Sequence, residues 1–234
     1  MKIALCMLTR NERACLDVVF PMIPKPPATA GFDEIYVIDG GSTDGTVEFF
    51  KQRDIPVIGQ SLRGRGQAFN IAFQSIKADA FIFFSPDGNE NPDDLHRFRP
   101  LLEQGADLVI ASRMMKGARN EEDGQLLRWR KWANKAFNLM ANLAFRRSGP
   151  FITDSINGYR AITAGAARRL QLDASDYTIE YQMTIRALKA GMRIVEFPTI
   201  EGQRVAGETQ AQSIPTGLRF LKAYGRELKT PAVR

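Results

Sequence analysis

The sequence predicts an α/β fold with a mostly parallel central sheet, for two reasons. Short runs rich in β-forming residues alternate along the chain with stretches in which apolar residues recur at helical spacing. Runs such as Phe81–Phe84 are apolar at every position, which is typical of parallel strands covered by helices on both faces. The 234 residues, 44% apolar and 25% charged, suffice for one large core and exclude a disordered or fibrous chain.

Six strands are expected in the chain. In order, they are Ile3–Leu8, Glu34–Asp39, Ile55–Ile58, Ala80–Phe84, Asp107–Ala111 and Arg193–Phe197. In the connections, apolar residues recur at helical steps, as at Ala68, Ala72 and Ile76. Four prolines between positions 21 and 27 predict a rigid surface loop instead of a linker between domains.

The pattern changes after Arg113 and becomes mainly helical. We expect a long helix at Leu126–Phe145 and shorter helices near Ala164–Leu170 and Thr178–Ala190. The whole chain, residues 1–234, is expected to form one domain built from two halves, residues 1–112 and 113–234.

Positive charge is concentrated in two segments. Residues 113–147 carry nine basic and three acidic side chains, and residues 203–234 carry six and two, in a chain of net charge +6. This distribution favours a local anionic ligand over a nucleic-acid-binding surface, and the sequence has neither zinc-finger spacing nor an RNP-like motif. We therefore expect no nucleic-acid partner.

Cysteine and histidine are scarce, which excludes several kinds of site. Cys6 and Cys15 form no CxxC pair and His96 is the single histidine, so no Cys/His set can hold zinc, and the sequence argues against a histidine-based triad. We expect both thiols to be buried and His96 to lie on a helix surface. The apolar run Ile3–Leu8 is too short to span a membrane, and we expect the protein in the cytoplasm.

Polar side chains follow the first two strands, at the edge where parallel sheets bind ligands. Thr9, Asn11 and Glu12 follow the first strand, and Asp39 ends the second. Asp39 favours contact with a nucleoside hydroxyl or a base N–H. In the following loop, residues 40–46, Ser42 and Asp44 are further candidates, with capping of the next helix as the alternative.

The fourth strand ends in a segment suited to a metal ion. Asp87 and Asn89 place a carboxylate and an amide oxygen two residues apart. Mg²⁺ or Mn²⁺ takes few protein oxygens at such sites and completes its coordination with phosphate and water. A turn built on the neighbouring Pro86 and Gly88 is the alternative explanation.

Taken together, these segments resemble family 2 glycosyltransferases with a GT-A fold, and in particular the dolichyl- or polyprenyl-phosphate glycosyltransferase branch. The matching segments are Leu8–Glu12, Asp39–Thr46, Gly64–Asn70, Ala111–Arg113, Asp154–Arg160, Glu196–Pro198 and Arg204–Thr209. The resemblance implies that a nucleotide-sugar donor binds to the half at 1–112 and an acceptor to the half at 113–234.

The resemblance also implies roles for individual residues. The expected contacts to the nucleoside part of the donor are Thr9, Glu12, Asp39 and Arg65, with Asn11, Ser42, Asp44 and Ser85 as further donor contacts. Asp87 and Asn89 would hold Mg²⁺ or Mn²⁺ beneath the diphosphate, and Arg204 would close over the phosphates.

Two departures from the family pattern support an alternative. Ser85 stands where the family's metal motif has an aspartate, and Gln210 stands where a lysine is usual. The chain could therefore be a binding or regulatory protein without activity. A nucleotidyltransferase is a third possibility, although residues 8–12 lack the glycine- and lysine-rich signature that holds a triphosphate.

The main prediction is an inverting transfer of a sugar to a polyprenyl or dolichyl phosphate or to a cell-envelope glycan. A hydroxyl acceptor needs a general base, for which Glu180 and Asp154 are the candidates. Alternatively, Asp154 pairs with Arg160 and Glu180 interacts with a helix dipole. A phosphate acceptor is already ionised and needs arginines instead, and we expect these to be Arg113, Arg128 and Arg130.

The long helix also predicts contact with a membrane surface. Its apolar positions are Trp129, Trp132, Ala136, Phe137, Met140 and Leu143, among the basic residues Arg128, Arg130, Lys131, Lys135, Arg146 and Arg147. Such a helix can lie among lipid headgroups, or its apolar stripe can be an ordinary core face. A second basic helix face is expected at Arg219, Lys222, Arg226 and Lys229, so the protein is expected to be cytoplasmic and peripheral at the membrane.

Overall fold

The protein is described by a computed structural model, in which residues 1–26, 31–124, 129–206 and 213–232 are placed. Arg128, expected to be an acceptor ligand, and Gln210 lie outside these residues.

Seven strands form one sheet in the order β3-β2-β1-β4-β6-β5-β7. The strands are β1 (Ile3–Thr9), β2 (Glu34–Asp39), β3 (Val57–Gly59), β4 (Ala80–Phe84), β5 (Leu108–Ser112), β6 (Arg160–Thr163) and β7 (Ile194–Pro198). β6 runs antiparallel to its neighbours β4 and β5, and every other pair in the sheet is parallel. The predicted mostly parallel sheet is confirmed, and strands from both halves of the chain meet in it.

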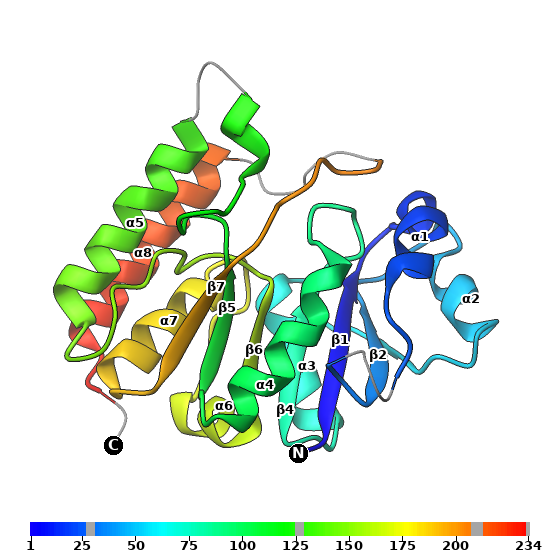
Figure 1. Ribbon diagram of the computed structural model, residues 1–234, viewed down its shortest axis with the longest axis horizontal. Helices are drawn as coiled ribbons and strands as arrows, with labels where there is room; N and C mark the ends of the chain where they lie inside the picture. The colour runs from blue at the N-terminus through cyan, green and yellow to red at the C-terminus, as the bar shows by residue number, and fades with distance from the viewer. Residues whose placement is uncertain (27–30, 125–128, 207–212, 233–234) are drawn as a thin grey trace.

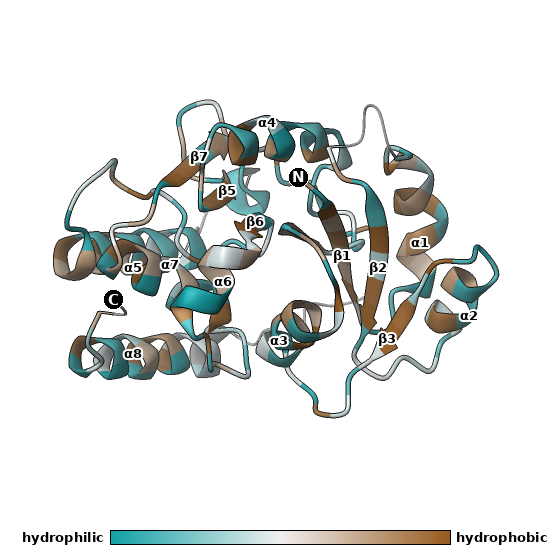
Figure 2. Ribbon diagram, turned by 90° about the horizontal axis from the view of Figure 1, so that it is seen from below, coloured by the Kyte–Doolittle hydropathy of each residue, from teal (hydrophilic) through white to brown (hydrophobic). Residues whose placement is uncertain are grey.

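Helices cover both faces of this sheet (Figure 1). They are α1 (Arg13–Val19), α2 (Thr46–Lys51), α3 (Arg65–Ser75), α4 (Phe98–Glu103), α5 (Trp129–Phe145), α6 (Ala164–Leu170), α7 (Ile179–Lys189) and α8 (Ser213–Lys229). Within the described residues, three short 3₁₀ helices lie at Phe20–Met22, Pro92–Arg97 and Glu121–Gly124. Figure 2 shows that β1 and β3 are largely hydrophobic, whereas the helices carry both hydrophobic and hydrophilic residues.

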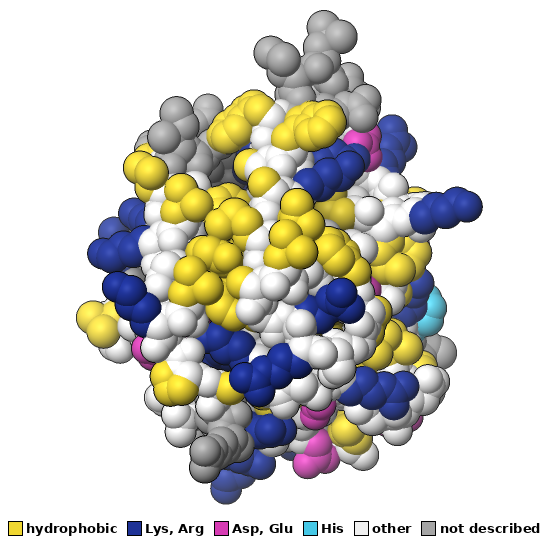
Figure 3. Space-filling model, turned by 90° about the vertical axis from the view of Figure 1, so that its left-hand side faces the viewer, with side chains coloured by type: hydrophobic (Ala, Val, Ile, Leu, Met, Phe, Trp, Pro, Cys, Tyr) yellow, Lys and Arg dark blue, Asp and Glu magenta, His cyan; other side chains and the backbone are white. Residues whose placement is uncertain are grey.

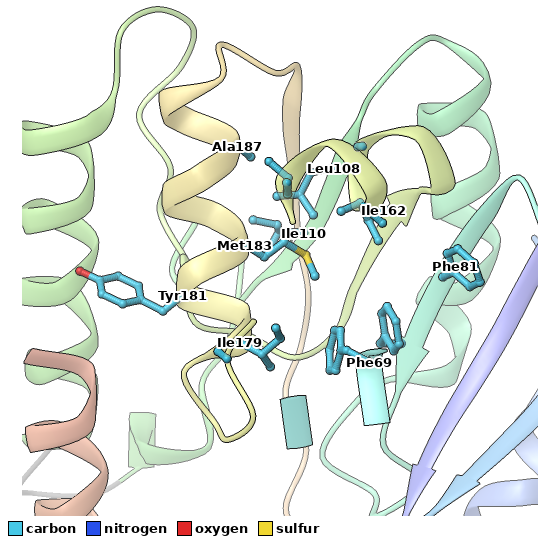
Figure 4. Close-up of a cluster of buried hydrophobic side chains, with 14 of the residues drawn as sticks. Phe69, Phe81, Leu108, Ile110, Ile162, Ile179, Tyr181, Met183 and Ala187 are labelled. Atoms are coloured by element: carbon cyan, nitrogen blue, oxygen red, sulfur yellow. The ribbon is translucent and has the colours of Figure 1, made fainter. Parts of the chain in front are cut away.

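The core consists of two clusters because side chains alternate between the faces of a strand. Phe81 and Phe83 of β4 belong to a cluster with α3, α6 and α7 (Figure 4), and Ile82 and Phe84 belong to one with α1, α2 and α4. Figure 4 shows the first cluster reaching as far as Tyr181 on α7.

Helices α5 and α8 lie side by side at one end of the molecule, beyond α7 and far from α1 and α2 (Figure 1). The rings of Phe137 and Phe220 pack against each other and against Tyr181, with centroids 5.3 to 5.8 Å apart. The buried Glu227 of α8 forms salt bridges of 3.0 and 2.9 Å with Arg186 and Lys189 of α7. Both apolar and ionic contacts therefore hold α8 against α7.

Several predicted elements differ from the structure. The strand at Arg160–Thr163 was not expected, and the strand expected at Ile55–Ile58 lies at Val57–Gly59. Cys6 and Cys15 are buried and His96 is exposed, as expected.

Candidate active site

A cavity of about 800 Å³ lies at the carboxyl ends of the strands and extends to α5 and α8. At one end it is lined by residues that follow β1, β4 and β7, including Glu12, Asp87 and Arg204. At the other end it is lined by Phe137 of α5 and Arg219 of α8. We call these the donor end and the acceptor end.

The loop after β2 is organised around Asp39. Its Oδ1 accepts hydrogen bonds from the hydroxyls of Thr9 (3.0 Å) and Ser42 (2.5 Å), and its Oδ2 accepts from the backbone N–H groups of Gly41 (2.9 Å) and Ser42 (2.8 Å). Asp39 is buried, and Ile38 and Gly40 on either side of it line the cavity. In this structure the Asp39 carboxylate therefore holds the loop in place.

Asn11, Ser42 and Asp44 also hold this loop. Ser42 Oγ accepts from the Asn11 N–H at 2.9 Å, and Asn11 Oδ1 accepts from Thr43 N–H at 2.9 Å. Asp44 accepts hydrogen bonds from Thr46 and from the backbone of Arg13 at the start of α1. These contacts correspond to the turn and capping role considered as an alternative, and they hold Thr9 and Glu12 beside the cavity.

Asp87 and Asn89 have the oxygen atoms that a divalent cation requires. Asp87 Oδ1 accepts from Asn89 N–H at 3.1 Å, and the amide nitrogen of Asn89 donates to Glu121 at 3.0 Å. Asn89 Oδ1 is then buried without a hydrogen-bond partner among the described residues. A carboxylate beside an unpaired amide oxygen fits Mg²⁺ or Mn²⁺, which takes few protein ligands when phosphate is present.

Glu90 is a site residue that the sequence analysis missed. Its side chain lines the cavity, and its Oε2 accepts from Ser85 N–H at 2.7 Å. Burial of the Glu90 carboxyl group raises its pKa to about 8, and the negative charge of Asp87 is the second cause of this rise. The sequence did contain a signal for Glu90, because it is the third acidic or amide side chain, after Asp87 and Asn89, within four residues.

Arg204 connects three strand ends. Its Nη1 donates to Asp87 at 2.8 Å, and its Nη2 donates to both carboxylate oxygens of Glu12 at 2.7 and 2.8 Å. The segment around it lies on the turn that follows β4, where Val205 N–H donates to the Asp87 carbonyl at 2.9 Å. A Cβ at Gly88 would lie 2.5 Å from Val205 Cγ2, so only glycine permits this approach. Three residues expected to contact the donor are thus in direct contact with one another.

Arg65 and Glu180 form a salt bridge in the wall of the cavity. Arg65 Nη1 also lies 3.4 Å from Ser85 Oγ. A Cβ at Gly158 would lie 2.0 Å from Arg65 Nη2, so a side chain at this position would displace the guanidinium from its place beside Glu180. The Glu180 side chain is 3% exposed, and its carboxylate is bound to an arginine at the surface of the cavity.

Asp154 is fully buried and pairs with Arg113 through two hydrogen bonds of 2.8 and 3.1 Å. The expected alternative, a pair with Arg160, is wrong, because Arg160 donates to the backbone carbonyls of Asn157, Glu180 and Ser155. Burial opposes ionisation of Asp154, but the charge and hydrogen bonds of Arg113 lower its pKa below the ordinary value. Asp154 and Arg113 therefore stabilise the wall of the cavity.

The acceptor end combines aromatic and basic side chains. Trp129 and Phe137 of α5 and Phe220 of α8 line it, together with Arg130 and Arg219. Arg130 pairs with Glu121 at 3.1 Å and with Glu122 at 3.9 Å. Arg219 lies 3.9 Å from Asp176 and is largely exposed.

The apolar surface expected on α5 is divided between two faces. Phe137 packs in the core and Met140 packs against it, whereas Trp132 is 70% exposed and Leu143 is 77% exposed. Exposed hydrophobic side chains of the two helices are Trp129, Trp132, Leu139, Leu143, Leu218, Leu221 and Leu228. On this face, which we call the α5–α8 face, hydrophobic and basic side chains are interspersed (Figure 3). Of the helices in the described residues, none has the length and apolar character to cross a bilayer.

Comparison with known proteins shows the family of the chain. The sequence profile of glycosyl transferase family 2 matches residues 5–162. Glycosyltransferase AglJ of Haloferax volcanii is 32% identical over 200 residues, which are 84% of this chain and 63% of that protein. The undecaprenyl-phosphate mannosyltransferase of Micrococcus luteus is 31% identical over 194 residues, which are 76% of this chain and 75% of that protein. The chain thus spans less than two thirds of the first of these relatives.

Solved structures show the same fold. Glucosyl-3-phosphoglycerate synthase from Mycobacterium tuberculosis, in complex with phosphoglyceric acid, superposes with a TM-score of 0.72 at 20% identity, covering 98% of this chain and 81% of that one. Another structure of that enzyme, with Mn²⁺, UDP-glucose and phosphoglyceric acid, has a TM-score of 0.72 at 18% identity, covering 98% and 80%. The expected GT-A fold is confirmed. Since the family profile covers most of the chain and curated relatives exceed 30% identity, the chain belongs to glycosyl transferase family 2.

Proposed function

We propose that the protein transfers a sugar, with inversion at the anomeric carbon, from a nucleotide-diphosphate sugar to a polyprenyl-type lipid phosphate. The observation that carries this proposal is one cavity that joins the Glu12–Arg204–Asp87 cluster to an aromatic and basic end between α5 and α8. Relatives named undecaprenyl-phosphate mannosyltransferase and dolichol-phosphate mannosyltransferase support the choice of acceptor.

The donor end suits a nucleoside diphosphate. Asp87 and Asn89 would hold Mg²⁺ or Mn²⁺, which would neutralise the charge of the departing diphosphate. Arg204 can exchange its carboxylate partners for phosphate oxygens, since a guanidinium binds both groups through paired hydrogen bonds. The related synthase has been solved with Mn²⁺ and UDP-glucose, which supports the same ligand class here.

The acceptor end suits a nucleophile that needs no base. Its carboxylates already accept protein hydrogen bonds: Glu180 from Arg65, Glu201 from Arg113, Asp176 from Thr178 and Glu121 from Arg130. A lipid phosphate is ionised near neutral pH, so its oxygen can attack the anomeric carbon directly. The new bond joins that oxygen to the anomeric carbon, the bond from this carbon to the diphosphate breaks, and the nucleoside diphosphate leaves. Arg130 and Arg219 can orient the attacking phosphate.

The α5–α8 face is suited to an anionic membrane surface. The 17 residues of α5 include Arg130, Lys131 and Lys135 and no acidic residue, and the one acidic residue of α8, Glu227, is buried. Exposed Trp and Leu side chains beside basic ones are typical of helices that lie among lipid headgroups. Residues of the same two helices line the acceptor end of the cavity, so a lipid phosphate would reach it from the membrane surface.

Sedimentation with vesicles of phosphatidylglycerol and phosphatidylcholine tests this contact. We expect binding that weakens with added salt, because each basic residue near an anionic surface contributes about 1 kcal/mol. The double variant Trp132→Ser/Leu143→Ser should bind at least about tenfold more weakly, since burying each side chain contributes about 1.5–3 kcal/mol. The control Val18→Ser replaces a half-exposed apolar residue of α1 and should bind like the wild type.

Absence of vesicle binding, or equal binding by the double variant and the wild type, would reject the membrane contact. It would leave a glycosyltransferase that uses a soluble acceptor.

A further inference from the structure

We propose that Glu90 provides the second carboxylate of the divalent-cation site, at the place where Ser85 provides none. This inference rests on the proposed function in one respect, namely that Asp87 and Asn89 bind the cation. It goes beyond that function because it assigns a ligand that lies outside the family's motif as it stands in this sequence.

The turn after β4 folds so that the side chain of Glu90 reaches Ser85, the first residue of the turn. β4 ends at Phe84, and the next residue, Ser85, donates its backbone N–H to Glu90 Oε2 at 2.7 Å. The carboxylate of the last residue of the turn thus lies at the backbone of the first. Ser85, Asp87 and Glu90 all line the same cavity. The carboxylate ligand missing from the Ser85 side chain is therefore available at the Ser85 backbone.

Asn89 provides an independent sign of a cation at this turn. Its amide nitrogen is used by Glu121 at 3.0 Å, and its Oδ1 is buried without a hydrogen bond from the described part of the chain. A buried oxygen of this kind needs a donor or a cation. Asp87, Asn89 and Glu90 then offer a carboxylate, an amide oxygen and a second carboxylate within four residues, a set of hard oxygen ligands suited to Mg²⁺ or Mn²⁺.

The charges around the turn explain why one carboxylate is insufficient. Asp87 forms a salt bridge of 2.8 Å with Arg204, and the Arg65 guanidinium lies 3.4 Å from Ser85 Oγ. Two positive side chains next to a single aspartate would repel a divalent cation. Glu90 accepts one hydrogen bond from a neutral backbone group through Oε2, and its Oε1 accepts none from the residues placed in the structure. Its Oε1 is therefore available to a cation.

The competing explanation is that Glu90 only supports the turn through Ser85. Glu90→Gln separates the two roles, because the amide oxygen of glutamine still accepts the Ser85 N–H bond while the carboxylate ligand is lost. Adding Ser85→Asp to this variant then supplies a carboxylate from the side chain of residue 85 itself. A matched control is Glu196→Gln: Glu196 also accepts backbone N–H bonds, from Thr153 at 2.7 Å and Asp154 at 2.9 Å, and it belongs to β7.

The experiment measures binding of Mn²⁺ alone to the full chain, from the electron paramagnetic resonance signal of free Mn²⁺, with a thermal melt of each variant. We expect Glu90→Gln to weaken Mn²⁺ binding by about tenfold or more, equivalent to about 1.4 kcal/mol. Glu90→Gln/Ser85→Asp should regain most of the lost affinity, and Glu196→Gln should bind like the wild type.

Wild-type affinity in Glu90→Gln would overturn the inference, and so would a folded double variant that regains nothing. Absence of Mn²⁺ binding in the wild type would overturn the cation site as a whole. Since the measurement involves neither nucleotide nor acceptor, its outcome does not depend on whether the protein transfers a sugar to a lipid phosphate.

Discussion

Arg204 and Asp87, 117 residues apart in the sequence, form a salt bridge of 2.8 Å between Nη1 and Oδ2. The guanidinium lies at the carboxylate on which a divalent cation would bind. A divalent cation at Asp87 would therefore compete with Arg204 for the same carboxylate until phosphate groups offer Arg204 other partners.

This competition predicts opposite effects of Arg204→Gln on two ligands. Mn²⁺ alone should bind about tenfold more tightly, a change of about 1.4 kcal/mol, because a repelling charge and a competitor are removed. UDP with Mn²⁺ should bind more weakly, by about 1.5–3 kcal/mol, because a charge-assisted hydrogen bond to phosphate is lost. Calorimetric titration measures both affinities.

Arg99→Gln provides the control for this experiment. Arg99 lies on α4 and forms a salt bridge of 2.8 Å with Asp33, so its replacement should leave both affinities unchanged. Weaker binding of Mn²⁺ to Arg204→Gln would contradict the competition.

A second prediction concerns Asp87 itself. Asp87→Ala should abolish the stabilisation by nucleotide that depends on a divalent cation, whereas Ser85→Ala should largely retain it, because a hydroxyl is a poor ligand for a hard cation. A thermal-shift series with UDP, GDP and TDP, each with Mn²⁺ or Mg²⁺, measures this. A ligand at about 100 times its Kd stabilises the folded state by about 2.7 kcal/mol. Undiminished cation-dependent stabilisation of Asp87→Ala would remove Asp87 from the site.

The salt bridge between Arg65 and Glu180 predicts a positioning role for Glu180. Glu180→Gln should lower the free energy of unfolding by about 1–3 kcal/mol, because Arg65 loses its charged partner in the cavity wall. With a lipid phosphate acceptor, the pH dependence of kcat/KM should keep its shape. If one ionisation disappears from the pH profile of Glu180→Gln, Glu180 is the general base and the acceptor carries a proton.

Asp154 should contribute to stability in a pH-dependent way. Asp154→Asn should cost about 3–5 kcal/mol near pH 7, since it leaves the charge of Arg113 buried and unpaired. Because the folded-state pKa of Asp154 is lowered, its contribution is complete above the unfolded pKa of about 3.9 and is lost as the pH falls through the folded value. Urea unfolding of both proteins at a series of pH values measures the difference. A difference that is constant down to the acid transition would contradict the lowered pKa.

The sequence predicted the strands best where burial alone determines the pattern. Phe81–Phe84 are apolar at every position and form β4, which is buried along its length. β6 was missed because it is four residues long and begins with Arg160, a fully buried arginine. Its guanidinium is satisfied by the backbone carbonyls of Asn157 (2.7 Å) and Glu180 (2.8 Å), contacts that local propensity does not reveal.

The location of the site was predictable, but its pairings were not. Ligands bind at the carboxyl ends of parallel strands, and this rule predicted that Glu12 and Asp87 lie at one edge of the sheet. In the structure both residues line the same cavity. Arg160 was the wrong partner for Asp154. Arg113, which directly follows β5 and is 41 residues away in the sequence, pairs with Asp154 instead. Glu90 was missed because a glutamate beside a turn has no distinctive pattern until the fold returns its side chain to Ser85.

Sugar transfer to a lipid phosphate tests the central claim most directly. The full chain is incubated with Mn²⁺ and undecaprenyl phosphate in detergent, separately with UDP-, GDP- and TDP-sugars, and the anomeric configuration of the product is determined by NMR. We predict transfer to the lipid phosphate with inverted configuration from at least one donor, and its loss in Asp87→Ala. Transfer only to a soluble acceptor such as phosphoglyceric acid, retention of configuration, or no transfer from any of these donors would contradict the account.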